Sequence, residues 1–310
     1  MASIMDRIAA GEVLVLDGAM GTEIQKRGAP MDDIAWCATA IRTNPEIVRG
    51  AHEDYIRAGA DVITANTFAT ARHVLAPAGL AEETPFYNRR AVELAIEARD
   101  AAADRPVWIA GSVSSMVGGV ALEYKSPLEE VRANYQEQAA LLAEAGADLI
   151  LLEMMMDRDY AVAAAEAGAA SGLPVWVGFS CRIDGAGAVR MFREGHSDPD
   201  LDPLFDAVID DVMAPGGVVA GIMHTELAHV GPALDVLKAR WSGPLMVYAE
   251  DGDEGMPIEW RFIDLVTPEA YAVMARGWVN QGVQAVGGCC GLGVEHIAAL
   301  KRALPGRLPG

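Results

Sequence analysis

Short apolar segments of strand length recur eight times along the chain, and each is followed by a longer stretch with helical periodicity. The eight segments span 13–18, 61–66, 106–111, 148–153, 174–179, 217–222, 244–249 and 283–288. Apolar and polar residues do not alternate within them, which is typical of parallel strands buried on both faces. The pattern predicts an α/β fold in which helices connect parallel strands.

Residues that favour helix ends support this division. The sequences NPE at 44–46 and TPE at 267–269 each place an N-cap residue before a proline in the first helical turn. The phrases AGAD at 58–61 and 145–148 and NQGV at 280–283 precede strands, and their glycines predict left-handed helix ends.

Eight strand–helix units without a linker or a break in composition predict one (β/α)8 TIM barrel domain over residues 1–310. A doubly wound sheet is the structural alternative. Two long loops at 181–206 and 249–266 follow strands, so both are expected on the face where barrel enzymes carry out chemistry.

Composition restricts the partners. The formal net charge of -20 would repel nucleic acid and anionic lipid, and no run of 18 apolar residues suggests a membrane span. The N-terminal sequence does not resemble a secretory signal, which favours a cytoplasmic protein. Four cysteines, two of them adjacent, favour reduced thiols over a disulfide framework. A homo-oligomer is compatible with the sequence.

The expected C-terminal strand ends are unusually polar. Each residue alone has an ordinary explanation as a turn or solvated loop residue, but the barrel would direct all of them toward one mouth. They are Asp17, Asn66, Ser112, Glu153, Ser180, Cys181, His224, Glu250, Cys289 and Cys290.

The pentapeptide GGCCG at 287–291 presents two thiols side by side between flexible glycines. Thiolates favour zinc, and a catalytic zinc site commonly has three protein ligands and one open position. Cys289, Cys290 and His224 satisfy that count. The alternatives are two inert buried thiols and a structural, hydrogen-bonded histidine.

The chain resembles the homocysteine S-methyltransferase family, which includes betaine- and S-methylmethionine-dependent enzymes. The resemblance rests on LDGAMGTE at 16–23, NPEIV at 44–48 with His52 and Tyr55, AGADVITANTF at 58–68, Glu153, and GGCCG at 287–291. It implies a (β/α)8 barrel, zinc on Cys289 and Cys290, and catalytic carboxylates at Asp17 and Glu153 that hold the amino group of homocysteine.

Three segments depart from the family pattern. A third family cysteine after strand six is replaced in GIMHTE at 221–226, so His224 would make the ligand set one charge less negative and a bound thiolate less nucleophilic. A proline-bearing phrase after strand three is replaced by GSVSSM at 111–116, and a Tyr-Pro-Asn phrase after strand seven by YAEDG at 248–252. These changes leave the donor and the acceptor open.

The predicted function is zinc-dependent transfer of a methyl group from a small onium donor, such as S-methylmethionine or betaine, to the thiol of homocysteine, giving methionine. Because eight units account for almost all 310 residues, we expect no second domain that would bind a folate or a corrinoid. The predicted substrate-binding residues are Asp17, Asn66, Ser112, Glu153, Tyr248 and Glu250. The acidic residues Glu250, Asp251, Asp253 and Glu254 would attract a cationic donor, and Trp36 or Tyr124 would offer it an aromatic face.

Three alternatives remain. The barrel could act on another thiol or methylated substrate, or use Cys289 or Cys290 as a covalent nucleophile, or another metal, in a lyase or hydrolase reaction. It could also be a metal-free barrel that binds a small molecule.

Overall fold

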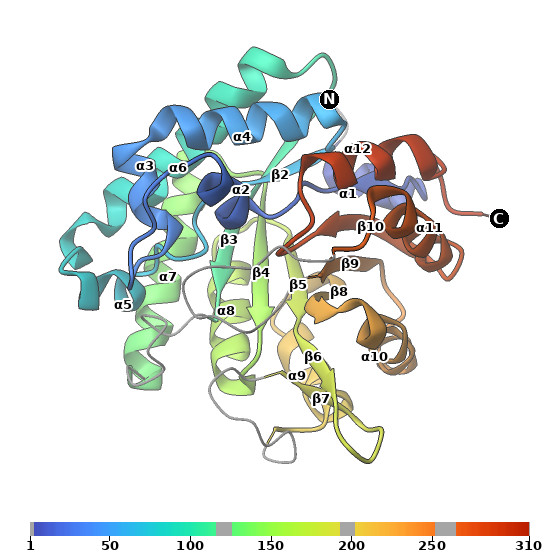
Figure 1. Ribbon diagram of the computed structural model, residues 1–310. Coiled ribbons are helices and arrows are strands. Elements are labelled where there is room, and N and C mark those ends of the chain that lie inside the picture. The colour runs from blue at the N-terminus through green and yellow to red at the C-terminus, as the bar shows by residue number, and fades with distance from the viewer. Residues whose placement is uncertain (1–2, 116–125, 193–201, 252–264, 310) are drawn as a thin grey trace.

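A parallel barrel organises the computed structural model, which describes residues 3–115, 126–192, 202–251 and 265–309 (Figure 1). The barrel strands are β1 (Leu14–Val15), β2 (Val62–Thr64), β3 (Trp108–Ser114), β4 (Leu149–Met155), β5 (Val175–Phe179), β8 (Gly217–Glu226), β9 (Leu245–Glu250) and β10 (Val283–Gly288). They coincide with the eight segments predicted from the apolar pattern.

The sheet order confirms the barrel and excludes the doubly wound alternative. Neighbouring strands run β1-β10-β9-β8-β5-β4-β3-β2, and all of these pairs are parallel. A parallel bridge between Leu16 and Val62 then joins β1 to β2, and the Asp17 amide donates to the Val62 carbonyl at 3.0 Å. Strand order around the ring therefore follows the chain.

Helices surround these strands. They are α1 (Ile4–Ala9), α2 (Met20–Lys26), α3 (Ala40–Thr43), α4 (Pro45–Ala58), α5 (Arg72–Leu75), α6 (Thr84–Ala102), α7 (Leu128–Ala145), α8 (Arg158–Ala170), α9 (Ile209–Met213), α10 (Leu227–Arg240), α11 (Pro268–Val279) and α12 (Val294–Ala303). Short 3-10 turns lie at η1 (Cys37–Thr39), η2 (Ala76–Ala78), η3 (Ala81–Glu83) and η5 (Phe205–Ala207). Among the described residues, no helix has the length and apolar character needed to cross a membrane.

The predicted helix ends are largely confirmed. Gly59, Gly146 and Gly282 adopt φ values of 111°, 101° and 100° at or just beyond the ends of α4, α7 and α11. Thr267 caps α11 by accepting a hydrogen bond from the Ala270 amide at 3.2 Å, whereas the Asn44 side chain makes no such bond at α4.

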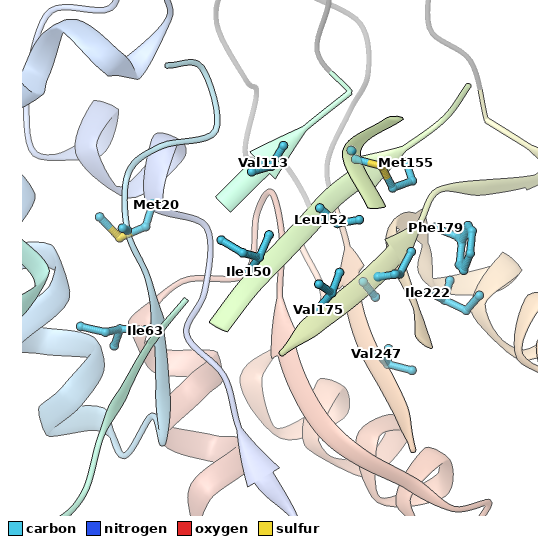
Figure 2. Close-up of a cluster of buried hydrophobic side chains, with 14 of the residues drawn as sticks. Met20, Ile63, Val113, Ile150, Leu152, Met155, Val175, Phe179, Ile222 and Val247 are labelled. Carbon is cyan, nitrogen blue, oxygen red and sulfur yellow. The ribbon is translucent and has the colours of Figure 1, made fainter. Parts of the chain in front are cut away.

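Side chains of successive strand residues enter two separate cores. In β4, Leu149 and Leu151 belong to the cluster inside the barrel, whereas Ile150 and Leu152 pack between the barrel and its helices (Figure 2). This alternation is the two-residue period of a strand. Helix α1 closes the lower end of the barrel, where Ile8 joins the inner cluster and its carbonyl accepts from Gln284 at 2.8 Å.

The segment after β5 contains an element that the sequence did not reveal. Strands β6 (Cys181–Ile183) and β7 (Val189–Met191) form an antiparallel hairpin inside the predicted long loop. The Asp184 carboxylate accepts hydrogen bonds from the amides of Ala186 and Ala188 and so stabilises the turn between β6 and β7.

Candidate active site

The strand period brings two predicted carboxylates to the upper end of the barrel interior. Glu153 lies two residues after Leu151, and Glu250 lies two residues after Tyr248, and both of these preceding residues belong to the inner core. Side chains two positions apart share a face of a strand. Glu153 and Glu250 are buried, with 8% and 4% of their surfaces exposed.

Two non-glycine residues beside these positions have left-handed backbones. Met154 has φ 56° in β4 and His224 has φ 43° in β8, and each lies where the pairing register with the next strand shifts. Such conformations cost on the order of 1–3 kcal/mol each and persist where surrounding structure enforces them. Bulges of this kind redirect side chains, which here places His224 at the barrel mouth.

Hydrogen bonds from the end of β5 support the irregular segment around His224. The Ser180 hydroxyl donates to the Met223 carbonyl at 3.1 Å, and the Cys181 amide donates to the Thr225 hydroxyl at 3.0 Å. The predicted site residues Ser180 and Cys181 therefore contact Met223 and Thr225, the two residues on either side of the histidine.

The turn that carries the two cysteines needs its last glycine. Gly291 has φ 81°, and a Cβ at this position would overlap the carbonyl oxygen of Asp251. Because the backbones of Gly291 and Asp251 lie so close, the Asp251 amide can donate to the Cys290 carbonyl at 3.0 Å. The Cys289 amide donates to the Ala249 carbonyl at 2.7 Å. The cysteine turn is thus attached to the end of β9.

The three predicted metal ligands meet at this mouth. The Sγ atoms of Cys289 and Cys290 are 3.9 Å apart, and Cys289 Sγ is 3.7 Å from Nδ1 of His224. Tetrahedral zinc bonds of about 2.3 Å to sulfur and about 2.05 Å to nitrogen place two sulfurs about 3.8 Å apart and a sulfur–nitrogen pair about 3.6 Å apart. These residues therefore fit a zinc ion.

The cysteine pair is also electrostatically prepared for a cation. The neighbouring Cys290 thiol and the His224 imidazole lower the pKa of Cys289 below its usual range, although burial opposes this shift. A thiolate is the form that binds metal.

Asp17 is held by the protein itself. Its carboxylate accepts hydrogen bonds from the Thr64 amide at 2.6 Å, the Thr64 hydroxyl at 2.9 Å and the Tyr248 hydroxyl at 3.3 Å. Burial nevertheless raises its pKa to about 7. Tyr248, predicted to bind substrate, also donates to the Gly18 carbonyl at 3.1 Å, so its hydroxyl positions the first strand end.

Glu153 has fewer stabilising contacts. Burial raises its pKa to about 8, and the negative charges of Cys289 and Asp17 add to the shift, while the Ser112 hydroxyl opposes it. A carboxyl group with so high a pKa favours a cationic partner, and such groups occur frequently at functional sites.

Other predicted binding residues have different surroundings. The Asn66 side chain is occupied by Cys37, since its amide donates to the Cys37 carbonyl and its oxygen accepts from the Cys37 thiol, both at 3.0 Å. Trp36 packs edge-on against Phe68, with ring centroids 5.7 Å apart. Asp251 accepts from the Val266 amide. The remaining donor-binding candidates, Tyr124, Asp253 and Glu254, lie outside the described residues.

Sequence reasoning missed two contributions to this site. Thr64, which holds Asp17 through its amide and hydroxyl, gave no signal because it lies inside an apolar strand. Glu250 was assigned to substrate binding, but its carboxylate oxygen lies 2.5 Å from Nδ1 of His224, beside the cysteines.

Comparison with known proteins gives a consistent result. The family model described as homocysteine S-methyltransferase matches residues 14–304. Selenocysteine Se-methyltransferase from Brassica oleracea var. italica is 29% identical over 96% of this chain and 90% of its own length. Homocysteine S-methyltransferase YbgG from Bacillus subtilis (strain 168) is 27% identical over 94% of this chain and 95% of its own length.

A solved structure agrees with the fold. The metallated form of the Escherichia coli homocysteine methyltransferase MmuM has a TM-score of 0.73 and 27% sequence identity, and the match covers 94% of this chain and 96% of that one.

Proposed function

Because this chain belongs to the homocysteine S-methyltransferase family and is therefore a methyltransferase, we propose that it methylates the thiol of homocysteine with a small onium donor, giving methionine. S-methylmethionine, betaine or a similar compound would be the donor. The alternatives without methyl transfer, a nucleophilic-cysteine lyase or hydrolase and a metal-free binding barrel, have no support from the comparisons.

The convergence of Cys289, Cys290 and His224 carries this proposal. Their ligand atoms meet at separations that fit zinc, and the metallated form of MmuM supports a metal in this family. Zinc bound there would keep the substrate thiol deprotonated yet nucleophilic.

The carboxylates orient the acceptor in this proposal. Glu153 binds the amino group of homocysteine, because it is buried and its pKa of about 8 falls when an ammonium group approaches. Asp17 is fixed by Thr64 and contributes a second negative charge at the same mouth. Holding the amino acid at this end directs its sulfur toward the cysteine turn, and such positioning lowers the barrier substantially.

Methyl transfer itself needs little help at the donor. The thiolate sulfur attacks the methyl carbon, the bond from that carbon to the positively charged sulfur or nitrogen breaks, and its electron pair leaves with a neutral product. No acid is required at the donor side, because the leaving group gains an electron pair and loses its charge.

A turnover assay tests the proposal. Zinc-loaded protein is incubated with homocysteine and, separately, S-methylmethionine, betaine, other sulfonium compounds and methyltetrahydrofolate, and the product is identified by mass spectrometry. Methionine formed only from onium donors is expected; methionine formed only from methyltetrahydrofolate would contradict the donor assignment.

The acceptor needs its own arm of the assay. A relative named selenocysteine Se-methyltransferase is as similar to this chain as relatives named for homocysteine. Selenocysteine and cysteine are therefore assayed in parallel with homocysteine. A higher kcat/KM with either compound would show that it, and not homocysteine, is the preferred methyl acceptor.

A further inference from the structure

The carboxylate of Glu250 lies on the same side of the His224 imidazole as the cysteines. Its Oε2 is 2.5 Å from Nδ1, and the same Nδ1 is 3.7 Å from Cys289 Sγ. The ligand atoms of Glu250, His224, Cys289 and Cys290 all lie within 4.8 Å of one another. A carboxylate that only orients a metal-binding histidine contacts the ring nitrogen facing away from the metal. Glu250 instead shares the nitrogen that faces the thiols.

Strand order explains this placement. Strand β9 pairs with β8 on one side and with β10 on the other, so the end of β9 separates His224 from the cysteine turn. Glu250 is the last residue of β9 and its side chain follows the inner face of the strand. It is therefore directed between the other ligands.

One oxygen of the Glu250 carboxylate has no hydrogen-bond partner in the described part of the chain. Glu250 is 4% exposed, and its Oε2 makes no hydrogen bond of normal geometry with any residue that the structure describes. Burial of an unpaired carboxylate oxygen is unfavourable, and a bound cation removes that penalty.

Charge supplies an independent argument. Two thiolates and a neutral imidazole carry a charge of −2, whereas the three thiolates of the family pattern carry −3. Glu250 occupies the last position of the phrase that is Tyr-Pro-Asn in the family and Tyr248-Ala249-Glu250 here. Adding its carboxylate returns the ligand charge to −3. The two departures are adjacent in space, so the carboxylate compensates for the lost thiolate.

We propose that Glu250 is a fourth protein ligand of the metal in the resting enzyme. This inference rests on the proposed zinc site of Cys289, Cys290 and His224. Glu250 holds the position that a catalytic zinc site keeps for water or substrate, and it restores the negative charge that His224 removes. Its earlier assignment to donor binding is replaced by this role.

A double-mutant cycle tests the proposal. Zinc dissociation constants are measured by competition with a chromophoric chelator for the wild type, Glu250→Gln, His224→Ala and the double variant. Glu226→Gln is the matched control, because Glu226 pairs with Glu250 in register but is exposed and outside the metal cluster. We expect Glu250→Gln to weaken zinc binding about tenfold to hundredfold both in the wild type and in the His224→Ala background.

The outcomes separate the hypotheses. Unchanged affinity in Glu250→Gln would overturn the inference, and an effect that disappears in the His224→Ala background would show that Glu250 acts only through the histidine. X-ray absorption of zinc-loaded wild type and Glu250→Gln checks the ligand set without a histidine variant, and loss of a carboxylate oxygen is expected. If the wild type binds no zinc, or keeps it after Cys289→Ser and Cys290→Ser, the proposed zinc site itself fails.

Discussion

Replacing Glu153 with glutamine should improve stability and impair acceptor binding at the same time. The pKa of Glu153 is about 8 in the folded protein against an ordinary value of 4.5. A carboxyl group with a raised folded pKa costs stability as pH rises from the unfolded value toward the folded value, because the unfolded chain loses its proton first. At pH 7 this cost reaches at most about 3 kcal/mol, and the uncharged glutamine removes it.

The effect on the substrate has the opposite sign. Loss of a charged partner for the homocysteine ammonium costs about 1.5–3 kcal/mol, which corresponds to a roughly tenfold to hundredfold higher KM. Urea unfolding of metal-free protein at pH 5 and pH 7.5 measures the first effect, and steady-state kinetics measures the second. Zinc content should not change. An unaltered KM together with unaltered stability at pH 7.5 would refute the reasoning.

Asp17→Asn is the instructive comparison. The Asp17 carboxylate accepts from the Thr64 amide, the Thr64 hydroxyl and the Tyr248 hydroxyl, and asparagine offers one acceptor oxygen fewer. One of these hydrogen bonds to a charged oxygen is lost, at a cost of about 1–3 kcal/mol. Because burial raises the pKa of Asp17 to about 7, removing its charge also recovers stability at neutral pH, and the lost hydrogen bond offsets part of that gain. Asp17→Asn should therefore raise the melting temperature less than Glu153→Gln does.

The barrel was predictable because its information is local and redundant. Eight apolar runs, separated by helical stretches that end at glycines such as Gly59 and Gly146, admit few arrangements, and a single misplaced boundary would not change the result. The same reasoning predicted that His224, Cys289 and Cys290 lie close together, since the C-terminal ends of all barrel strands lie on one face.

Side-chain direction at the strand ends was not predictable in the same way. His224 and Met154 adopt φ values of 43° and 56°, although positive φ is uncommon for residues other than glycine. Contacts from neighbouring strands impose these conformations, as Ser180 does on the carbonyl before His224. Likewise, the pairing of Asn66 with Cys37 joins residues that are distant in sequence, and no local pattern reveals it.

Three further predictions follow from the site and its support. Cys289→Ser and Cys290→Ser should each lose most of the bound zinc by elemental analysis, and His224→Cys should keep it, since a thiolate replaces the imidazole; retained zinc in both serine variants would remove the cysteines from the site. His52 is fully buried, its ring nitrogens have no hydrogen bond to a described residue, and burial lowers its pKa to about 3. Between pH 6.5 and about pH 3 the His52 imidazole binds a proton in the unfolded chain but not in the folded one. The His52 contribution should therefore lower the free energy of unfolding by about 2 kcal/mol between pH 7 and pH 5, and urea unfolding of His52→Leu should lack this pH-dependent decrease. Gly291→Ala should lower both the melting temperature and zinc affinity, because its left-handed backbone alone costs about 1–2 kcal/mol for an alanine and the new methyl group would overlap a carbonyl at the end of β9. Relief of that overlap must move the cysteine turn away from β9, so a Gly291→Ala protein with unchanged zinc affinity would show that the attachment of the turn to β9 does not define the metal site.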